Sequence, residues 1–357
     1  MNLRSINLLT KLLFICFKVC DIIYILGYIW RLIMKDKILD LLKENKNEFV
    51  SGQEISKKLG VTRAAIWKHI NSLKENGYDI DSVSKKGYKL ILCPDILTND
   101  EIKSHLNTEF MGRNIIHFEE LDSTNLFAKK IADTLEGEGH TIITERQFNG
   151  RGRLGRQWVS QNSNGIWMSI ILRPSLSIFE VSKITQVVAA AVNLAFANQG
   201  IETKIKWPND IIIKDKKVCG ILTELNSEVN NINYVVVGIG INVNNSIEDF
   251  PEELRNIATS VFIETSKKLK RNILVAEILN NFEKLYIDLN NNDFSKSLDI
   301  CRKNSYVIGK EINLIKNQET KVAKAIDINE AGELVVEYKN GDIDNIISGE
   351  ISVRIIK

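Results

Sequence analysis

The chain has 357 residues, of which 44% are hydrophobic and 26% charged, with only 4 prolines. This length allows two or three domains with buried cores, and the composition excludes a disordered or fibrous protein. A formal net charge of +2 neither favours nor excludes a nucleic acid partner, so any basic surface has to arise from local clusters.

The cysteines and histidines argue against disulfides and metal. The 5 cysteines are scattered and form no CxxC pair, which indicates reduced thiols and a cytoplasmic protein. The 4 histidines have neither helical i,i+4 spacing nor neighbouring cysteines. We therefore expect no structural metal site.

Residues 12–30 are largely apolar with basic flanks, a pattern that a membrane anchor or signal sequence would share. Lys18 and Asp21 fall inside the stretch, where each charge costs about 3 kcal/mol at the centre of a bilayer. No small-residue cleavage site follows. We expect residues 1–33 to reflect a translation start at Met34 or an otherwise non-functional extension, and we expect no membrane association.

Residues 34–94 predict three helices and a hairpin. A helical pattern starts at Met34, and Ser51 with Glu54 three residues later is typical of a capping box. Gly60 ends this second helix, and Thr62 is the N-cap of a third that runs to about residue 76. Residues 78–91 alternate like a strand pair around the turn at 85–87, and a linker follows at residues 93–95. This is the order of a winged helix-turn-helix.

The third helix has two distinct faces. Ile66, Ile70 and Leu73 share helical spacing and are expected in the core. The face that a recognition helix turns toward the DNA major groove and the tip of the wing carry the expected DNA contacts, namely Arg63, Trp67, Lys68, Asn71, Lys74, Lys85 and Lys86. The alternative is a winged helix that binds another protein or nothing, with its charges solvated.

The rest of the chain predicts two further regions. Residues 97–302 mix strands, such as 142–144, 167–172 and 234–240, irregularly with helices at 184–198 and 272–290. This pattern predicts a mixed α/β body within an overall α+β protein. The tail from residue 305 has only short strand-like runs, which predict a small all-β barrel. We expect domains at 34–94, 95–303 and 304–357.

A loop rich in glycine and arginine is the most informative segment. In residues 150–156, GRGRLGR, the glycines allow close backbone approach, and the arginines suit a compact, highly charged anion such as the phosphates of a nucleotide. A basic loop bound to a nucleic acid backbone is the alternative.

Three further segments add polar groups. Residues 206–210, KWPND, offer the oxygens of Asn209 and Asp210 to a hydroxyl, an amine or magnesium. Lys217 lies among apolar strand residues and needs an anion, unless it reaches out to water. Residues 238–244, GIGINVN, end a strand with two asparagines. Together these groups suit the activation of a carboxylate by ATP, because fixed positive charge offsets the repulsion between the two anions.

These motifs, in this order, resemble the bifunctional biotin protein ligases of the biotin operon repressor type. The resemblance runs from about Met34 to the C-terminus, and its markers are Ser123-Thr124-Asn125, Gln147, GRGRLGR, KWPND, Lys217 in KVCGIL, GIGINVN, residues 62–70 and the wing KKGYKL. It implies a winged helix, a central domain of the class II biotin/lipoate synthetase type and a C-terminal SH3-like barrel. Trp67 and Leu154 stand at motif positions that look variable.

The resemblance also implies roles for individual residues. Biotin would be bound by Ser123, Thr124, Asn125, Gln147, Arg151, Gly152, Arg153 and Lys217. The nucleotide would be bound by Arg153, Arg156, Trp158, Asn209 and Asn242, and Asp210 would assist the acceptor lysine. The catalytic residues would be Lys217, Arg151 and Arg153.

The implied reaction has two steps and a regulatory consequence. Biotin and ATP, with Mg²⁺, give biotinyl-5′-AMP, and a lysine of a biotin carboxyl carrier protein then attacks it. Persisting adenylate would act as corepressor by favouring a homodimer that binds operator DNA. Two alternatives are a lipoate ligase, whose RRxSGGG-like signature is absent here, and a biotin-responsive transcription factor without catalysis, against which Arg151, Arg153 and Lys217 argue.

Overall fold

The computed structural model describes residues 34–35, 37–45, 48–75, 77–228, 231–316, 319–347 and 352–355. It divides into two compact units, one ending at Asp95 and the other beginning at Ile96. The apolar extension at residues 1–33, together with the expectation attached to it, lies outside the described residues.

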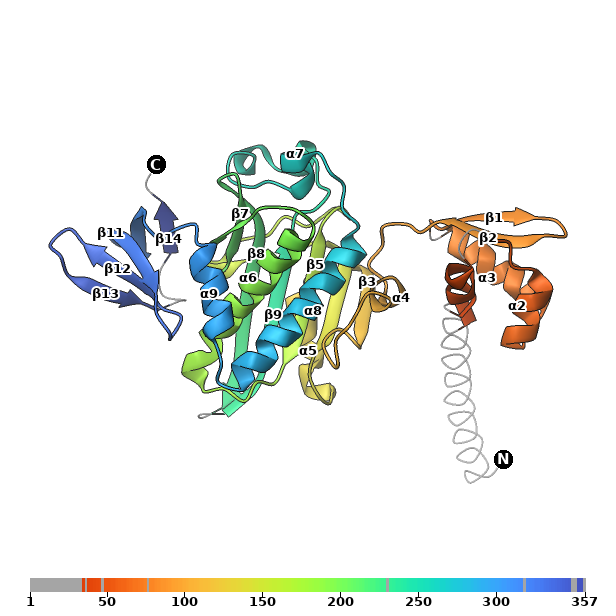
Figure 1. Ribbon diagram of the computed structural model, residues 1–357, viewed down its shortest axis with the longest axis horizontal. Helices are drawn as coiled ribbons and strands as arrows, with labels where there is room; N and C mark the ends of the chain where they lie inside the picture. The colour runs from red at the N-terminus through yellow and green to blue at the C-terminus, as the bar shows by residue number, and fades with distance from the viewer. Residues whose placement is uncertain are drawn as a thin grey trace, which may run out of the picture. The chain divides into compact units, whose positions relative to one another are not determined.

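The first unit is the winged helix-turn-helix that the sequence predicts (Figure 1). Helix α2 (Gly52–Leu59) begins at Ser51, whose hydroxyl accepts from the Glu54 amide, and ends at the left-handed Gly60. Helix α3 (Arg63–Glu75) begins where the Thr62 hydroxyl accepts from the Ala65 amide. Strands β1 (Asp79–Val83) and β2 (Gly87–Leu92) pair antiparallel as the wing. The predicted caps are confirmed, because local side-chain hydrogen bonds determine where these helices start.

The core of this unit is built from the positions that the helical spacing predicts. Ile66, Ile70 and Leu73 are buried, as are Ile38 of the first helical segment and Ile55 of α2. The wing is fixed to the helices where Val50 pairs with Tyr88 in an antiparallel bridge. Gly87 makes this pairing possible, since its φ is +112° and an added Cβ would overlap the backbone of Val50.

The second unit is organised around a seven-stranded sheet with the order β3-β4-β5-β9-β8-β7-β6. Only the pair of β3 (Ile115–Leu121) and β4 (His140–Gln147) is parallel among the pairs of this sheet. The other strands are β5 (Ile166–Leu172), β6 (Lys204–Lys206), β7 (Asp210–Ile213), β8 (Lys216–Glu228) and β9 (Asn231–Ile241). The body is therefore mixed, as the irregular alternation predicts.

Helices cover both faces of this sheet, which is why its central strands are apolar on both sides. On β9, Val235 and Val237 belong to the main core with α6 (Val181–Asn198) and α8 (Arg271–Asn290). The alternate residues Tyr234 and Val236 belong to a second core with α5 (Thr124–Ile131). Figure 1 shows α6 and α8 side by side across one face. Successive side chains of a strand point to opposite faces of the sheet, so β9 contributes apolar residues to two cores.

Short helices complete the unit: α4 (Asn99–Lys103), α7 (Val261–Thr265) and α9 (Ser295–Lys303). Among the described residues, one helix, Ile178–Asn198, is long and apolar enough to cross a membrane. Because 67% of its apolar window is buried inside the protein, the hydrophobicity of this helix is explained by the core.

The tail forms a five-stranded antiparallel sheet with the order β13-β12-β11-β10-β14. Its strands are β10 (Glu311–Lys316), β11 (Glu319–Ile328), β12 (Leu334–Tyr338), β13 (Ile343–Ile346) and β14 (Ser352–Ile355). All five are short, as the strand-like runs of the tail predict, and β13 and β14 have only four residues each. The all-β character of the tail is confirmed.

This tail packs against the rest of the second unit without a break in the core. Ile312, Leu334 and other tail residues belong to the same buried cluster as α6 and α8. The Gly332 carbonyl, in the turn between β11 and β12, accepts from Gln186 Nε2 at 2.6 Å and from Trp207 Nε1 at 3.1 Å. Both donors are buried, so this single carbonyl satisfies two groups that would otherwise lack a partner.

A buried ion pair joins α8 to β4. Arg271 Nη1 lies 2.8 Å from Glu145 Oε2, and both side chains are almost fully buried. Glu145 Oε1 also accepts from the Leu97 amide at 2.8 Å. Burial by itself raises the pKa of Glu145, but the hydrogen bond from His117 and the charge of Arg271 outweigh it and hold that pKa below its ordinary value.

Candidate functional site

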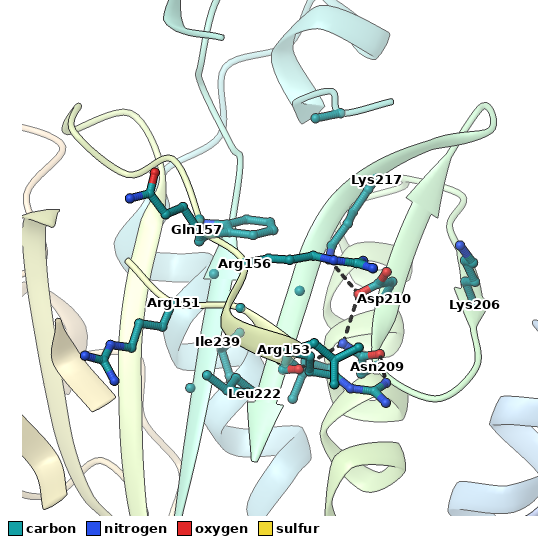
Figure 2. A pocket seen from close by; sticks show the side chains of 18 of the residues that line it. Arg151, Arg153, Arg156, Gln157, Lys206, Asn209, Asp210, Lys217, Leu222 and Ile239 are labelled. Carbon is teal, nitrogen blue, oxygen red and sulfur yellow. Dashed lines mark hydrogen bonds and ion pairs between the residues drawn. The ribbon is translucent and has the colours of Figure 1, made fainter. Parts of the chain in front are cut away.

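A cavity of about 700 Å³ opens against strands β5, β9, β8 and β7 of the seven-stranded sheet. Its walls come from the start of α5, the glycine-arginine loop, strands β8 and β9, the β6–β7 hairpin and residues 254–258. Segments that lie far apart in the sequence therefore meet here, and they include nearly all of the motifs that the sequence analysis selects (Figure 2).

One end of the cavity is lined by buried neutral polar groups. Ser123, Thr124 and Asn125 occupy the start of α5 and are almost inaccessible to solvent. Gln147 Oε1 accepts from the Thr124 amide at 2.9 Å and from the Thr124 hydroxyl at 3.1 Å. Ser169 Oγ lies 2.7 Å from Thr124 Oγ1 and 2.5 Å from Asn125 Oδ1. Such a cluster suits a neutral polar ring better than a charged group.

The glycine-arginine loop forms a short hairpin beside this end. The Gly152 amide donates to the Arg156 carbonyl at 2.8 Å, and the Trp158 amide donates to the Gly150 carbonyl at 2.9 Å. Leu154 at the tip is in the left-handed region with φ +56° and is 69% exposed. The tip is thus held by backbone bonds, with the Leu154 side chain turned outward.

Trp158 is the aromatic wall of the cavity. An added Cβ at Gly240 would lie 2.7 Å from Trp158 Nε1, so the absence of a side chain on β9 makes room for the indole. Lys217 Nζ lies 5.1 Å from the centre of the indole ring. The indole N–H is buried and has no hydrogen-bond partner among the residues that the structure describes, which leaves it as a donor for a bound molecule.

The other end of the cavity is strongly polar and cationic. Lys217 Nζ lies 2.7 Å from Asp210 Oδ1, and Asn209 Nδ2 donates to the same oxygen at 3.0 Å. Arg153 Nη1 donates to Asn209 Oδ1 at 2.7 Å. Burial, and the like charge of Arg156, lower the pKa of Arg153 against the opposing effect of Asp210. Because the charged form of Arg153 is destabilised in this way, the binding of an anion beside the guanidinium is favoured.

The arginines of the loop point in different directions. In Figure 2, Arg153 and Arg156 reach toward Asn209, Asp210 and Lys217, whereas Arg151 points away from them. Arg151 is exposed, although it still lines the cavity. The structure therefore brings two of the three loop arginines to the cationic end.

Asn242 is the predicted site residue that the structure places elsewhere. Its side chain is buried and donates to the Thr259 carbonyl at 3.0 Å, and it is absent from the cavity lining. The contact of Asn242 with the nucleotide stays a prediction. The chain doubles back at residues 256–259, where the Lys217 amide donates to the Ile257 carbonyl, and Asn242 supports this segment.

Several residues of the site carry no local sequence signal. Ser169 and Glu224 lie on interior strands and contact Asn125, and Tyr306 in the tail lines the cavity and donates to Asp215 Oδ1 at 2.7 Å. Only long-range pairing brings these side chains to the motifs. Hydrophobic periodicity alone could place Ser169 and Glu224 on strands, but not beside α5.

A separate groove of about 460 Å³ lies between α2, α3 and the wing in the first unit. Five of the seven predicted DNA contacts line it: Arg63, Trp67, Asn71, Lys74 and Lys85. Trp67 is 61% exposed, so it does not pack into the wing. Arg63 Nη2 donates to Gln53 Oε1 at 3.1 Å, and Lys74 Nζ donates to Ser82 Oγ at 2.9 Å. These bonds hold the two cations at the groove.

Metal-binding side chains do not gather in the described part of the chain. Within residues 34–355, apart from the segments that the structure does not describe, no group of three or more histidine, cysteine, aspartate or glutamate side chains could hold a metal ion.

Comparisons with known proteins agree with this geometry. Residues 35–89 match a helix-turn-helix domain, residues 118–242 match the biotin/lipoate A/B protein ligase family, and residues 307–354 match the biotin protein ligase C-terminal domain. Among solved structures, biotin protein ligase from Aquifex aeolicus in complex with biotin and ATP is similar, with a TM-score of 0.60 and 29% identity over 68% of this chain and 100% of that one.

Two curated relatives extend over nearly the whole chain. The bifunctional ligase/repressor BirA of Bacillus subtilis is 39% identical over 90% of this chain and 98% of its own length. The protein of the same name from Escherichia coli is 28% identical over 89% of this chain and 96% of its own length. The winged helix, the cavity and the C-terminal sheet follow one another along the chain in the order of the three matched domains. The chain belongs to the family of bifunctional biotin protein ligases and repressors.

Proposed function

We propose that the chain joins biotin to ATP as biotinyl-5′-AMP, releases diphosphate, and transfers biotin to a lysine of a biotin carboxyl carrier protein. The observation that carries this proposal is the polarity of the cavity. Buried neutral groups at Ser123–Asn125 form one end, and Arg153 with Lys217 forms the other. A neutral ureido ring with a carboxylate tail matches that order.

The first step requires a carboxylate to approach an α-phosphate, so two anions must be held together. Lys217 and Arg153 supply the fixed positive charge, and Arg156 lies close enough to Arg153 to add to it. Gln147 and the start of α5 hold the ring, Gly152 allows the loop to approach the ligand, and Arg151 closes over the adenylate once it forms. Trp158 and Asn209 lie along the nucleotide.

Mg²⁺ is proposed to enter with the phosphates of ATP. Magnesium is usually bound by one or two carboxylates together with substrate phosphates, and Asp210 and Asp215 are carboxylates that line the cavity. These residues fit that role. When bound, the ion would neutralise charge on the leaving diphosphate.

In the second step, the amine of the acceptor lysine attacks the carbonyl carbon of the mixed anhydride. The C–N bond forms, the C–O bond to the phosphate breaks, and AMP leaves with the electron pair. Asp210 lies at this end of the cavity and is proposed to take the proton from the amine.

The winged helix supports a second function, repression of biotin genes with biotinyl-AMP as corepressor. Exposed Arg63, Trp67 and Lys74 line one groove beside the wing, and the wing carries Lys85 and Lys86, a distribution that suits DNA phosphates and base edges. Lys68 and Asn71 complete the proposed contacts. We propose that the adenylate favours a homodimer that binds a two-fold operator.

We further propose that residues 34–94 bind DNA, that 95–303 carry the cavity and that 304–357 complete its wall. A cytoplasmic location is supported by Cys219 and Cys301, which are buried and form no disulfide.

Purified protein incubated with ATP, Mg²⁺ and a recombinant carrier domain tests the enzymatic proposal. We expect biotin-dependent release of diphosphate and a biotinylated carrier in the mass spectrum. A parallel reaction with lipoate distinguishes the related lipoate ligase activity. Transfer of lipoate without transfer of biotin would contradict the proposal, and a protein that binds biotin but releases no diphosphate would be a sensor without catalysis.

A further inference from the structure

We infer that Glu224 is a positioning residue that makes the cavity select ligands carrying ring N–H donors. The inference rests on the proposed assignment of the Ser123–Asn125 end to biotin. Its observation is a hydrogen-bond relay that runs from Glu224 on β8 through Asn125 to Ser169 on β5.

Glu224 has a fixed orientation. Its Oε1 lies 2.6 Å from Lys129 Nζ, and its Oε2 accepts from Asn125 Nδ2 at 2.8 Å. Asn125 and Lys129 are four residues apart on α5 and therefore lie on the same face of the helix. One carboxylate thus bridges two side chains of one helix, and each of its oxygens has a separate partner.

This contact determines which atom of the Asn125 amide faces which neighbour. A carboxylate only accepts, so the amide nitrogen must face Glu224. A longer bond of 3.4 Å to the Leu222 carbonyl engages the same nitrogen. Asn125 Oδ1 consequently lies on the opposite side, 2.5 Å from Ser169 Oγ, in a notch that exists because Gly238 lacks a Cβ. The reversed amide would place two acceptors against each other at Glu224.

The orientation has a consequence for ligand selection. Both N–H groups of the Asn125 side chain point toward acceptors on β8. Asn125 therefore presents an acceptor, and no donor, to its other neighbours. The Thr124 hydroxyl already donates to Gln147, and the Ser169 hydroxyl has a single proton. This wall of the cavity therefore favours a ring that brings its own N–H groups, as a cyclic urea does, over an aliphatic or dithiolane acid of similar length.

Replacing Glu224 by leucine removes the acceptor and frees the amide to rotate. We expect the ratio of kcat/KM for biotin to that for octanoate, each measured by ATP-dependent diphosphate release, to fall about tenfold, which corresponds to about 1.4 kcal/mol. The loss should appear in the KM for biotin, while kcat at saturating biotin and the KM for ATP stay within about twofold.

Two variants accompany this measurement. Glu224→Gln keeps an acceptor oxygen of the same shape and should retain most of the selectivity. Glu228→Leu makes the same replacement four residues further along β8 at an exposed position, and should behave as the unmodified protein. Circular dichroism melting of each variant shows whether it is folded.

The outcomes separate this inference from the proposed function. If the unmodified protein shows no biotin-dependent diphosphate release, the proposed function fails. If the unmodified protein is active and a folded Glu224→Leu variant keeps its selectivity, the inference is overturned. The inference is equally overturned if Glu224→Gln loses as much selectivity as the leucine variant, or if kcat falls with the KM for biotin unchanged.

Discussion

Replacing Lys217 by methionine removes the ammonium and keeps most of the apolar stem, so it isolates the charge at the reacting end of the cavity. Lys217 is 32% exposed and lies 2.7 Å from Asp210. At an effective dielectric constant near 20, two unit charges about 4 Å apart interact by about 4 kcal/mol. Loss of one preorganised donor or cation commonly removes about 3 to 4 kcal/mol of transition-state stabilisation. We therefore expect kcat for biotinyl-AMP formation to fall about 10²- to 10³-fold.

The same change should affect folding little. A partly exposed ion pair contributes about 1 kcal/mol or less, which for a unit of this size lowers Tm by about 3 °C at most. The assay is biotin-dependent diphosphate release, with melting followed in parallel. Lys214→Met is the matched control, since Lys214 lies at the adjacent turn and its side chain is 69% exposed. A Lys217→Met rate within threefold of the unmodified protein would refute the assignment of this ammonium to the chemistry.

Three further changes test other parts of the molecule. Gly238→Ala places a Cβ against Asn125 Oδ1, so the Kd for biotin measured by calorimetry should rise at least tenfold while the Kd for ATP is unchanged. Arg63→Ala should weaken operator binding and reduce its salt slope by about 1 without slowing biotin transfer, and equal loss of both activities would mean that the two units do not work separately. Glu145→Gln leaves Arg271 buried without its charged partner and should cost about 3 kcal/mol at pH 7. Because the folded pKa of Glu145 lies below its ordinary value of 4.5, its contribution is present above that pH and is lost as pH falls through the folded pKa. Tm plotted against pH from 7 to 3 should therefore fall less steeply at the acid end in the glutamine variant than in the unmodified protein. Parallel plots for the two proteins would contradict this account.

The features that could be predicted from the sequence are those determined by short-range physics. The Ser51 and Thr62 caps follow from a side chain that reaches an amide three residues away, and the burial of Ile66 and Ile70 follows from helical spacing. The glycine-arginine loop could be recognised as an anion site because its composition is local.

The features that could not be predicted depend on long-range pairing. The position of β9 between β5 and β8 brings Gly238 to Asn125, and no pattern within residues 238–244 indicates that neighbour. Asn242 shows another limit of local reasoning, since a polar residue at a strand end is as well suited to supporting a returning loop as to contacting a ligand. The position of residues 256–259, which bring the Thr259 carbonyl to Asn242, decides between those two roles.

The double acceptor at Gly332 bears on any attempt to engineer a smaller biotinylating enzyme. Gly332 has φ +81° in the turn between β11 and β12, where any other residue is strained, and an added Cβ would lie 2.6 Å from Gln186 Nε2 and push that side chain aside. A chain that ends at residue 303 would leave the donors Gln186 Nε2 and Trp207 Nε1 without this acceptor. It would also expose the apolar surface of α6 and α9. Miniaturisation has to begin at the winged helix, because the last fifty residues are part of what keeps the KWPND segment in place.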